Sequence, residues 1–236
     1  MQLVDRAAAL AGLAFAALVP LLIVYDAVAP AVDRQDFAEG VIDRFDLAGL
    51  AARSVRQALA PPSDVAQSLG VLSLVLVVIS ALSFARALQR LYERAFGLPA
   101  LGGLRGTPAT LVWLALIPAF VTASDALAAL SIGTLATVLS LALAAVLWTA
   151  TPFVLVARRL DWRVLVPAGV ITAVAMSLLG TATTIWMPRA VSDSASRFGL
   201  IGIAFALLSW LIVAGFALVG SATAGAVIAE RRWRPP

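Results

Sequence analysis

Long uncharged stretches alternate with short clusters of charged residues along the chain. Four stretches carry no charge at all, namely residues 7–25, 65–85, 164–188 and 198–229. Residues 106–157 hold a single charged residue, Asp125. About 20 residues in a helix span the roughly 30 Å hydrocarbon core of a bilayer, so each uncharged stretch suffices for one crossing and 106–157 for two.

This pattern predicts an all-α, polytopic membrane protein with about six transmembrane helices in a single transmembrane domain, residues 1–236. The expected spans are about 7–29, 66–87, 108–130, 133–157, 164–187 and 199–229. Strands of a membrane barrel would alternate polar and apolar residues over about 10 residues, which these stretches do not. Helices are the other way to satisfy the backbone in lipid. A secretory signal peptide is an alternative for residues 1–29, but its apolar run is long and Pro30 would follow the cleavage site.

Residues 30–65 are the largest segment outside the expected spans. Apolar residues recur there at helical spacing, Asp46 is placed to cap a second run, and Pro61-Pro62 would end it. We therefore expect an external amphipathic helical loop that lies on the outer leaflet or caps the bundle. A solvated hairpin with no binding role is the alternative.

The distribution of basic residues predicts the orientation. All 17 basic residues are arginine, and 11 of them fall on one side of the membrane if both termini are cytoplasmic. Short loops rich in arginine stay in the cytoplasm, so we expect the N-terminus and the C-terminus inside. The same rule explains the positive net charge without any binding to nucleic acid.

Several kinds of chemistry lack their residues. The chain has no cysteine, histidine or lysine, which excludes disulfides, thiol nucleophiles and the commonest general base and zinc ligands. No Gly-rich phosphate loop and no Ser-based catalytic group is recognisable. We therefore expect no enzyme, no catalytic residues, no metal and no cofactor.

Four charged residues at the expected membrane boundaries are the candidate lining of a substrate pathway. Asp26 and Asp125 lie at similar depth in the outer part of their spans, where buried carboxylates usually face water or a bundle interior. Arg86 and Arg90 follow one helix face where the second span enters the cytoplasm, a pattern suited to anionic lipid headgroups. The alternative is that the acids reach the outer interface and the arginines only fix the orientation.

Prolines and small residues predict how the helices bend and pack. Pro20, Pro118 and Pro152 lie inside expected spans, where proline removes a helix hydrogen bond and favours a kink. Small residues at spacings of four allow close helix packing. They form three such faces: Ala8, Gly12 and Ala16; Gly169, Ala173, Ser177 and Thr181; and Ala217, Ser221 and Gly225.

Tryptophans near the span ends are expected at the membrane interface, where the indole ring has one apolar and one polar side. This group comprises Trp113, Trp162, Trp186 and Trp233. Trp148 and Trp210 fall deeper and are expected to pack inside.

Several short motifs resemble those of the YihY/BrkB family of bacterial inner-membrane proteins. They are Ser80-Ala81 with Arg86-Ala87-Leu88-Gln89-Arg90-Leu91-Tyr92, Asp161-Trp162-Arg163 ahead of Pro167-Ala168-Gly169, and Phe198-Gly199-Leu200-Ile201-Gly202 leading to Trp210 and Gly220. The resemblance implies six transmembrane helices in the inner membrane. Members of that family have been linked to serum resistance and to the export of lipid or lipopolysaccharide, and the family was once labelled ribonuclease BN. The chain departs from the family at Gln89, where many members have Asn, and at Ser221-Ala222, where an acidic residue is missing.

Together these patterns favour a transporter or a translocator of lipid or another envelope component. A non-transporting scaffold for envelope assembly is the alternative, and a metal-dependent ribonuclease is not expected. The expected partners are membrane lipids with anionic headgroups, and the sequence does not indicate an oligomeric state.

Overall fold

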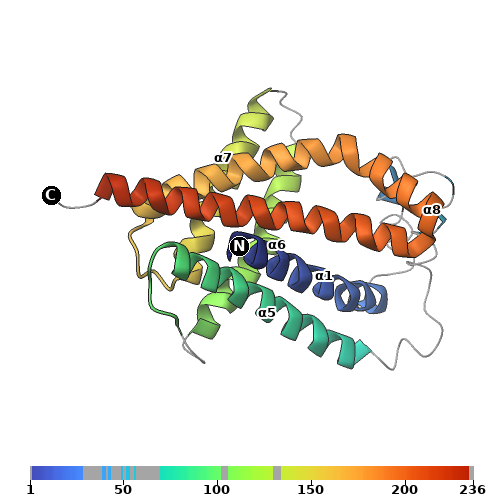
Figure 1. Cartoon of the computed structure of the whole chain (residues 1–236), viewed down its shortest axis with the longest axis horizontal. Coiled ribbons are helices and arrows are strands. Elements are labelled where there is room, and N and C mark those ends of the chain that lie inside the picture. Colours follow the sequence, from blue (N-terminus) through green and yellow to red (C-terminus); the bar gives the residue numbers. More distant parts are fainter. Residues whose placement is uncertain are drawn as a thin grey trace. The chain divides into compact units, whose positions relative to one another are not determined.

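A computed structural model describes most of the chain (Figure 1). The described residues are 2–28, 70–101, 106–129 and 134–233, with residues 39, 40, 42, 43, 49, 52, 53 and 56 in between. Side chains are described for most of these residues, but not for 18–28, 70–74 and several single positions that include 118 and 125. Helices joined by turns account for all of these ranges, with no strand among them. The prediction of an all-α fold is confirmed.

Five helices make up the longer described ranges: α1 (Gln2–Val28), α5 (Gly70–Ala95), α6 (Thr107–Ala129), α7 (Thr134–Leu155) and α8 (Trp162–Trp233). Five segments of the described part are long and apolar enough to cross a membrane: Val75–Ala95, Thr107–Ser124, Thr137–Leu155, Trp162–Gly199 and Ile201–Arg231. The molecule is therefore a multi-pass membrane protein. The count of six remains a prediction. The additional crossing would be the first in the chain, in α1, where many side chains are outside the described set.

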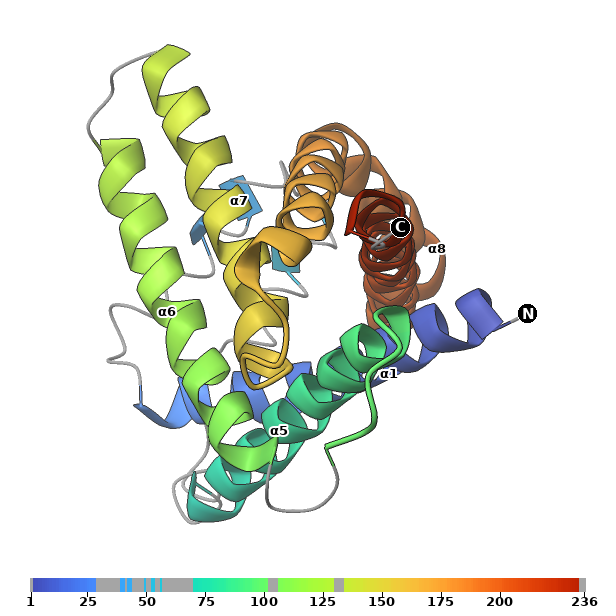
Figure 2. The same cartoon turned by 90° about the vertical axis from the view of Figure 1, so that its left-hand side faces the viewer.

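The chain divides into two compact units. The first unit comprises Met1–Leu10, Leu82–Leu178 and Ala214–Pro236, and the second comprises Ala11–Ala81 and Leu179–Val213. In the first unit α6 and α7 lie side by side (Figure 2). Trp113 of α6 is only 5% exposed and its indole nitrogen donates a hydrogen bond to Thr151 Oγ1 of α7 at 3.2 Å. Trp113 therefore packs between α6 and α7, and its expected position at the membrane interface remains a prediction.

In the second unit, α8 continues as a helix beyond the expected end of the fifth span at residue 187. Met187, Val191 and Ala195 recur every fourth residue and are all buried, so this polar stretch still presents one apolar face to the interior. The helix breaks at Gly199, whose φ of 60° and ψ of −138° suit glycine. Trp210 then donates to Thr183 Oγ1 at 2.7 Å, which places the segments on either side of Gly199 against each other.

The described residues of segment 30–65, which was expected to be external, also belong to the second unit. Ile42 and Ala52 are buried in the same apolar cluster as Met187 and Val191. Glu39 and Arg56 form a bidentate ion pair at 2.7 and 2.9 Å, and this hydrogen bonding holds the pKa of Glu39 below its ordinary 4.5. Part of segment 30–65 therefore packs on α8 through its apolar side chains.

The helical backbone continues through Pro20, Pro118 and Pro152. Pro152 is fully buried inside α7, while the side chains of the other two lie outside the described set. The kinks expected at these prolines remain a prediction. The junction between the expected spans 108–130 and 133–157 also lies outside the described residues.

Candidate functional site

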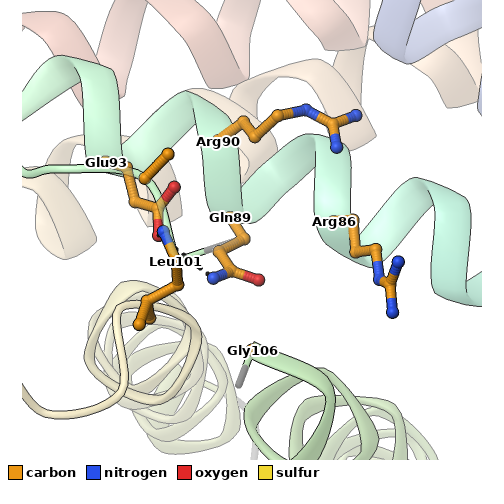
Figure 3. Close-up of a pocket in the computed structure, with 7 residues that line it drawn as sticks. Arg86, Gln89, Arg90, Glu93, Leu101 and Gly106 are labelled. Atoms are coloured by element: carbon orange, nitrogen blue, oxygen red, sulfur yellow. Dashed lines mark hydrogen bonds between the residues drawn. The ribbon is translucent and has the colours of Figure 1, made fainter. Parts of the chain in front are cut away.

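A polar cavity lies at the C-terminal end of α5. Its volume is about 200 Å³, and Figure 3 shows that most of its side chains come from α5. The lining residues are Arg86, Gln89, Arg90, Glu93, Ala100, Leu101 and Gly106. The polar lining residues are at positions 86, 89, 90 and 93, a spacing that places them on one side of a helix. The sequence of α5 thus builds one wall of the cavity by itself.

The end of α5 returns the chain to this wall. Gly97 has a φ of 64°, and Leu98 N donates to Glu93 O at 2.7 Å, a C-terminal arrangement typical of helices that end at glycine. The following residues run back along α5, so that Leu101 N reaches the Glu93 carboxylate at 3.0 Å.

Glu93 is the centre of a buried hydrogen-bond network. It is 2% exposed, and its Oε1 accepts hydrogen bonds from Gln89 Nε2 at 3.0 Å, Leu101 N at 3.0 Å and Arg159 Nη2 at 2.7 Å. A buried carboxylate needs such donors, because an unpaired one is strongly disfavoured. Arg159 lies 66 residues further along the chain, so this pair ties the end of α5 to the segment between α7 and α8.

A strained turn positions Arg159. Ala157 and Arg158 both adopt positive φ, at 55° and 57°, in a region that costs residues other than glycine about 1–2 kcal/mol. The turn directs Arg159 back toward the end of α5, where its Nη1 donates a hydrogen bond to Pro99 O at 2.6 Å. Its Nε donates to Val156 O of the turn itself at 2.9 Å. The contacts of Arg159 offset the strain stored in the turn.

Replacing Ala157 with glycine is expected to stabilise the protein by about 1 kcal/mol, because glycine adopts positive φ without the Cβ penalty. Thermal unfolding in detergent should show a midpoint about 2–4 °C higher. The matched control is Ala150→Gly within α7, which should lower the midpoint instead, since glycine in a helix interior is destabilising. Equal shifts for the two variants would show that the turn carries no strain.

The N-terminus of α6 forms the opposite wall of the cavity. Arg86 Nη2 donates to Thr107 Oγ1, the first residue of α6, at 3.1 Å. Gly106 precedes it, and a Cβ there would come within 2.9 Å of Gln89 Nε2, so glycine allows the close approach of α6 to α5. The first turn of a helix presents unpaired N–H groups and a partial positive charge.

The electrostatic balance of the cavity is positive. Arg159 neutralises Glu93 through their ion pair at 2.7 Å, which leaves the charges of Arg86 and Arg90 without a carboxylate partner among the described residues. Two arginines beside a helix N-terminus favour an anion. In the ranges that the structure describes, no cluster of three acidic side chains that could hold a metal occurs.

The structure brings together two of the four residues that the sequence singled out. Arg86 and Arg90 line the same cavity. Asp26 lies in α1 and Asp125 in α6, but neither side chain belongs to the described set, so their role in an outward-facing cavity remains a prediction. Gln89, Glu93, Gly106 and Arg159 were missed as site residues. The spacing of Gln89 and Glu93 to the arginines was a usable signal, whereas nothing in the sequence points to Arg159.

Comparison with known proteins adds the family. No curated protein and no solved structure matches the chain. The family model described as virulence factor BrkB matches residues 1–235. Because the match covers nearly the whole sequence, the resemblance inferred from the motifs at the end of α5 and around Gly199 is confirmed, and this multi-pass membrane protein belongs to the virulence factor BrkB family.

Proposed function

We propose that this protein resides in the bacterial inner membrane, with both termini in the cytoplasm, and translocates an anionic envelope component such as a phosphate-bearing lipid. The cavity at the end of α5 would then be the cytoplasmic entry site. The observation that supports this best is the positively charged cavity, in which Arg86 and Arg90 lack carboxylate partners among the described residues. The distribution of arginines supports the orientation.

The size of the cavity indicates what part of a substrate it would hold. At about 200 Å³ it is smaller than the roughly 300–1,000 Å³ of sites that enclose drug-sized ligands. It suits a headgroup rather than a whole lipid. Arg86 and Arg90 would bind the phosphate oxygens, and the first turn of α6 would add backbone N–H donors.

The alternative function is a scaffold for envelope assembly. It is favoured by the external segment, whose Ile42 and Ala52 pack on α8 and could hold a fixed surface for partners. Catalysis is not part of either proposal: the chain offers no histidine or cysteine, and we propose neither a ribonuclease activity nor binding of nucleic acid.

Replacing Arg86 and Arg90 together with glutamine is expected to slow lipid translocation at least 10-fold. Each charge-assisted hydrogen bond contributes about 1.5–3 kcal/mol, or roughly 10- to 100-fold in binding. The measurement is the transfer of fluorescent phosphatidylglycerol across vesicles that contain the purified protein. Arg94→Gln is the matched control, because Arg94 lies on the same helix but does not line the cavity, and it should keep the rate within twofold. If the native protein moves no lipid, the scaffold becomes the better hypothesis.

A further inference from the structure

A second concave site lies between α7 and the start of α8. It is an open groove of about 380 Å³ whose lining is almost wholly apolar. The residues that line it are Ala145, Val146, Thr149, Ala150, Phe153, Trp162, Val166 and Val170. None of them lines the cavity at the end of α5. The groove is therefore independent of the proposed translocation site.

The dimensions of the groove match one chain of a lipid. Its lining extends over residues 145–153 of α7 and 162–170 of α8, which at about 1.5 Å per residue corresponds to roughly 12 Å. One leaflet of the hydrocarbon core is about 15 Å thick, half of the roughly 30 Å total. In a membrane-spanning protein, an apolar groove of this length along two spans faces acyl chains.

One end of the groove carries two positive charges. Phe153 and Trp162 line that end, and an arginine lies over each ring: the Arg158 Cζ is 5.8 Å from the Phe153 centroid, and the Arg163 Cζ is 5.6 Å from the Trp162 centroid. Both rings therefore bring a guanidinium to the same end. Trp162 is 53% exposed, as expected of tryptophan at the membrane interface.

The contact with an aromatic ring leaves the arginines able to bind a further group. A cation–π contact does not use the N–H donors of a guanidinium, and these donors suit the paired oxygens of a phosphate. No side chain of the described residues accepts a hydrogen bond from Arg158 or Arg163. Both guanidiniums are thus oriented by an aromatic ring while their donors remain available.

We propose that the groove between α7 and α8 binds one phospholipid with an anionic headgroup, whose acyl chain lies along residues 145–153 and 162–170 and whose phosphate contacts Arg158 and Arg163. The acyl chain explains the apolar lining, and the headgroup complements the paired charges at one end. Basic sites between transmembrane helices bind anionic lipids in this manner. The bound lipid covers the contact between α7 and α8 and is a structural ligand rather than cargo.

The test uses the full chain in detergent with dioleoyl phosphatidylglycerol or dioleoyl phosphatidylcholine added, and native mass spectrometry to count bound lipids. We expect phosphatidylglycerol to bind in preference to phosphatidylcholine. Replacing both Arg158 and Arg163 with glutamine should lower the affinity for phosphatidylglycerol roughly 25-fold, about fivefold per arginine, and leave that for phosphatidylcholine within twofold. Ala150→Phe, which fills the groove, should weaken both lipids alike.

The double replacement of Arg86 and Arg90 separates this site from the cavity at the end of α5. It should remove only the phosphatidylglycerol bound at that cavity and should change the affinity of the site that depends on Arg158 and Arg163 less than threefold. If replacing Arg158 and Arg163 removes no bound phosphatidylglycerol while replacing Arg86 and Arg90 does, the proposal is refuted. Equal binding of the two lipids would also refute it. The proposal would also be refuted if the lipid-free protein formed dimers that Ala150→Phe dissociates, because a second copy of the chain would then occupy the groove. If the arginine variants fail to fold, a photoreactive phosphatidylglycerol on the unaltered chain must label residues 145–170, and labelling elsewhere alone would contradict the assignment.

Discussion

Replacing Glu93 with glutamine should destabilise the protein by about 3 kcal/mol, the largest effect expected for a single charged residue of the described part. The substitution keeps the shape of the side chain but removes the negative charge of the carboxylate, which accepts hydrogen bonds from Gln89, Leu101 and Arg159. Breaking one side of a buried ion pair costs about 3–5 kcal/mol. Arg159 is 23% exposed at its side chain, so water solvates part of the freed charge, and we expect the lower end of that range. The unfolding midpoint in detergent should fall by roughly 6–12 °C.

Two comparisons identify the network as the cause. Asp193→Asn is the matched control, because Asp193 is an exposed carboxylate of α8, and its stability should change by less than about 0.5 kcal/mol. Combining Glu93→Gln with Arg159→Gln should cost less than the sum of the two single changes, since the second removes the charge that the first leaves unpaired. Strictly additive effects would show that Glu93 and Arg159 do not depend on each other.

Features carried by local sequence were predictable. Uncharged stretches long enough for a bilayer predicted apolar helices, because in lipid the backbone must bond within its own segment. Arg86 and Arg90 were found because i and i+4 share one side of a helix. The small face that contains Gly169 was also correct, since a Cβ there would come within 2.7 Å of Thr149 N. At Gly12, by contrast, no described atom lies within 4 Å of the added Cβ, so this glycine is not at a close helix contact. Small residues in an alanine-rich chain also recur at this spacing without packing.

Features that depend on long-range contacts were not predictable. The Glu93–Arg159 pair joins residues 66 positions apart, and no periodicity links them. The sequence places Trp113 near a span end, but its side chain turns inward because Thr151 of α7 accepts its N–H. The groove between α7 and α8 requires the geometry of two helices, so its lining of ordinary apolar residues carried no signal in the sequence.

Introducing a methyl group at Gly169 should disrupt the packing of α7 against α8. A Cβ at this position would come within 2.7 Å of both Thr149 N and Thr149 Cα. These are backbone atoms that cannot rotate away, so the two helices must separate. Overpacking costs about 1–3 kcal/mol in well-packed interiors, and we expect Gly169→Ala to reach the upper part of that range because close backbone approach is a main source of helix association in lipid. The unfolding midpoint in detergent should fall by roughly 4–12 °C.

The same substitution elsewhere in α8 provides the control. A Cβ on Gly180 meets no atom within 4 Å among the described residues, so Gly180→Ala should stabilise the helix by about 0.5–1 kcal/mol through its lower backbone entropy cost. Adding Thr149→Ala to Gly169→Ala should restore stability only in part, because the added Cβ clashes with the backbone N and Cα of residue 149 as well as with its side-chain Oγ1. Full rescue by Thr149→Ala, or equal effects at Gly169 and Gly180, would mean that α7 and α8 do not approach each other at this point.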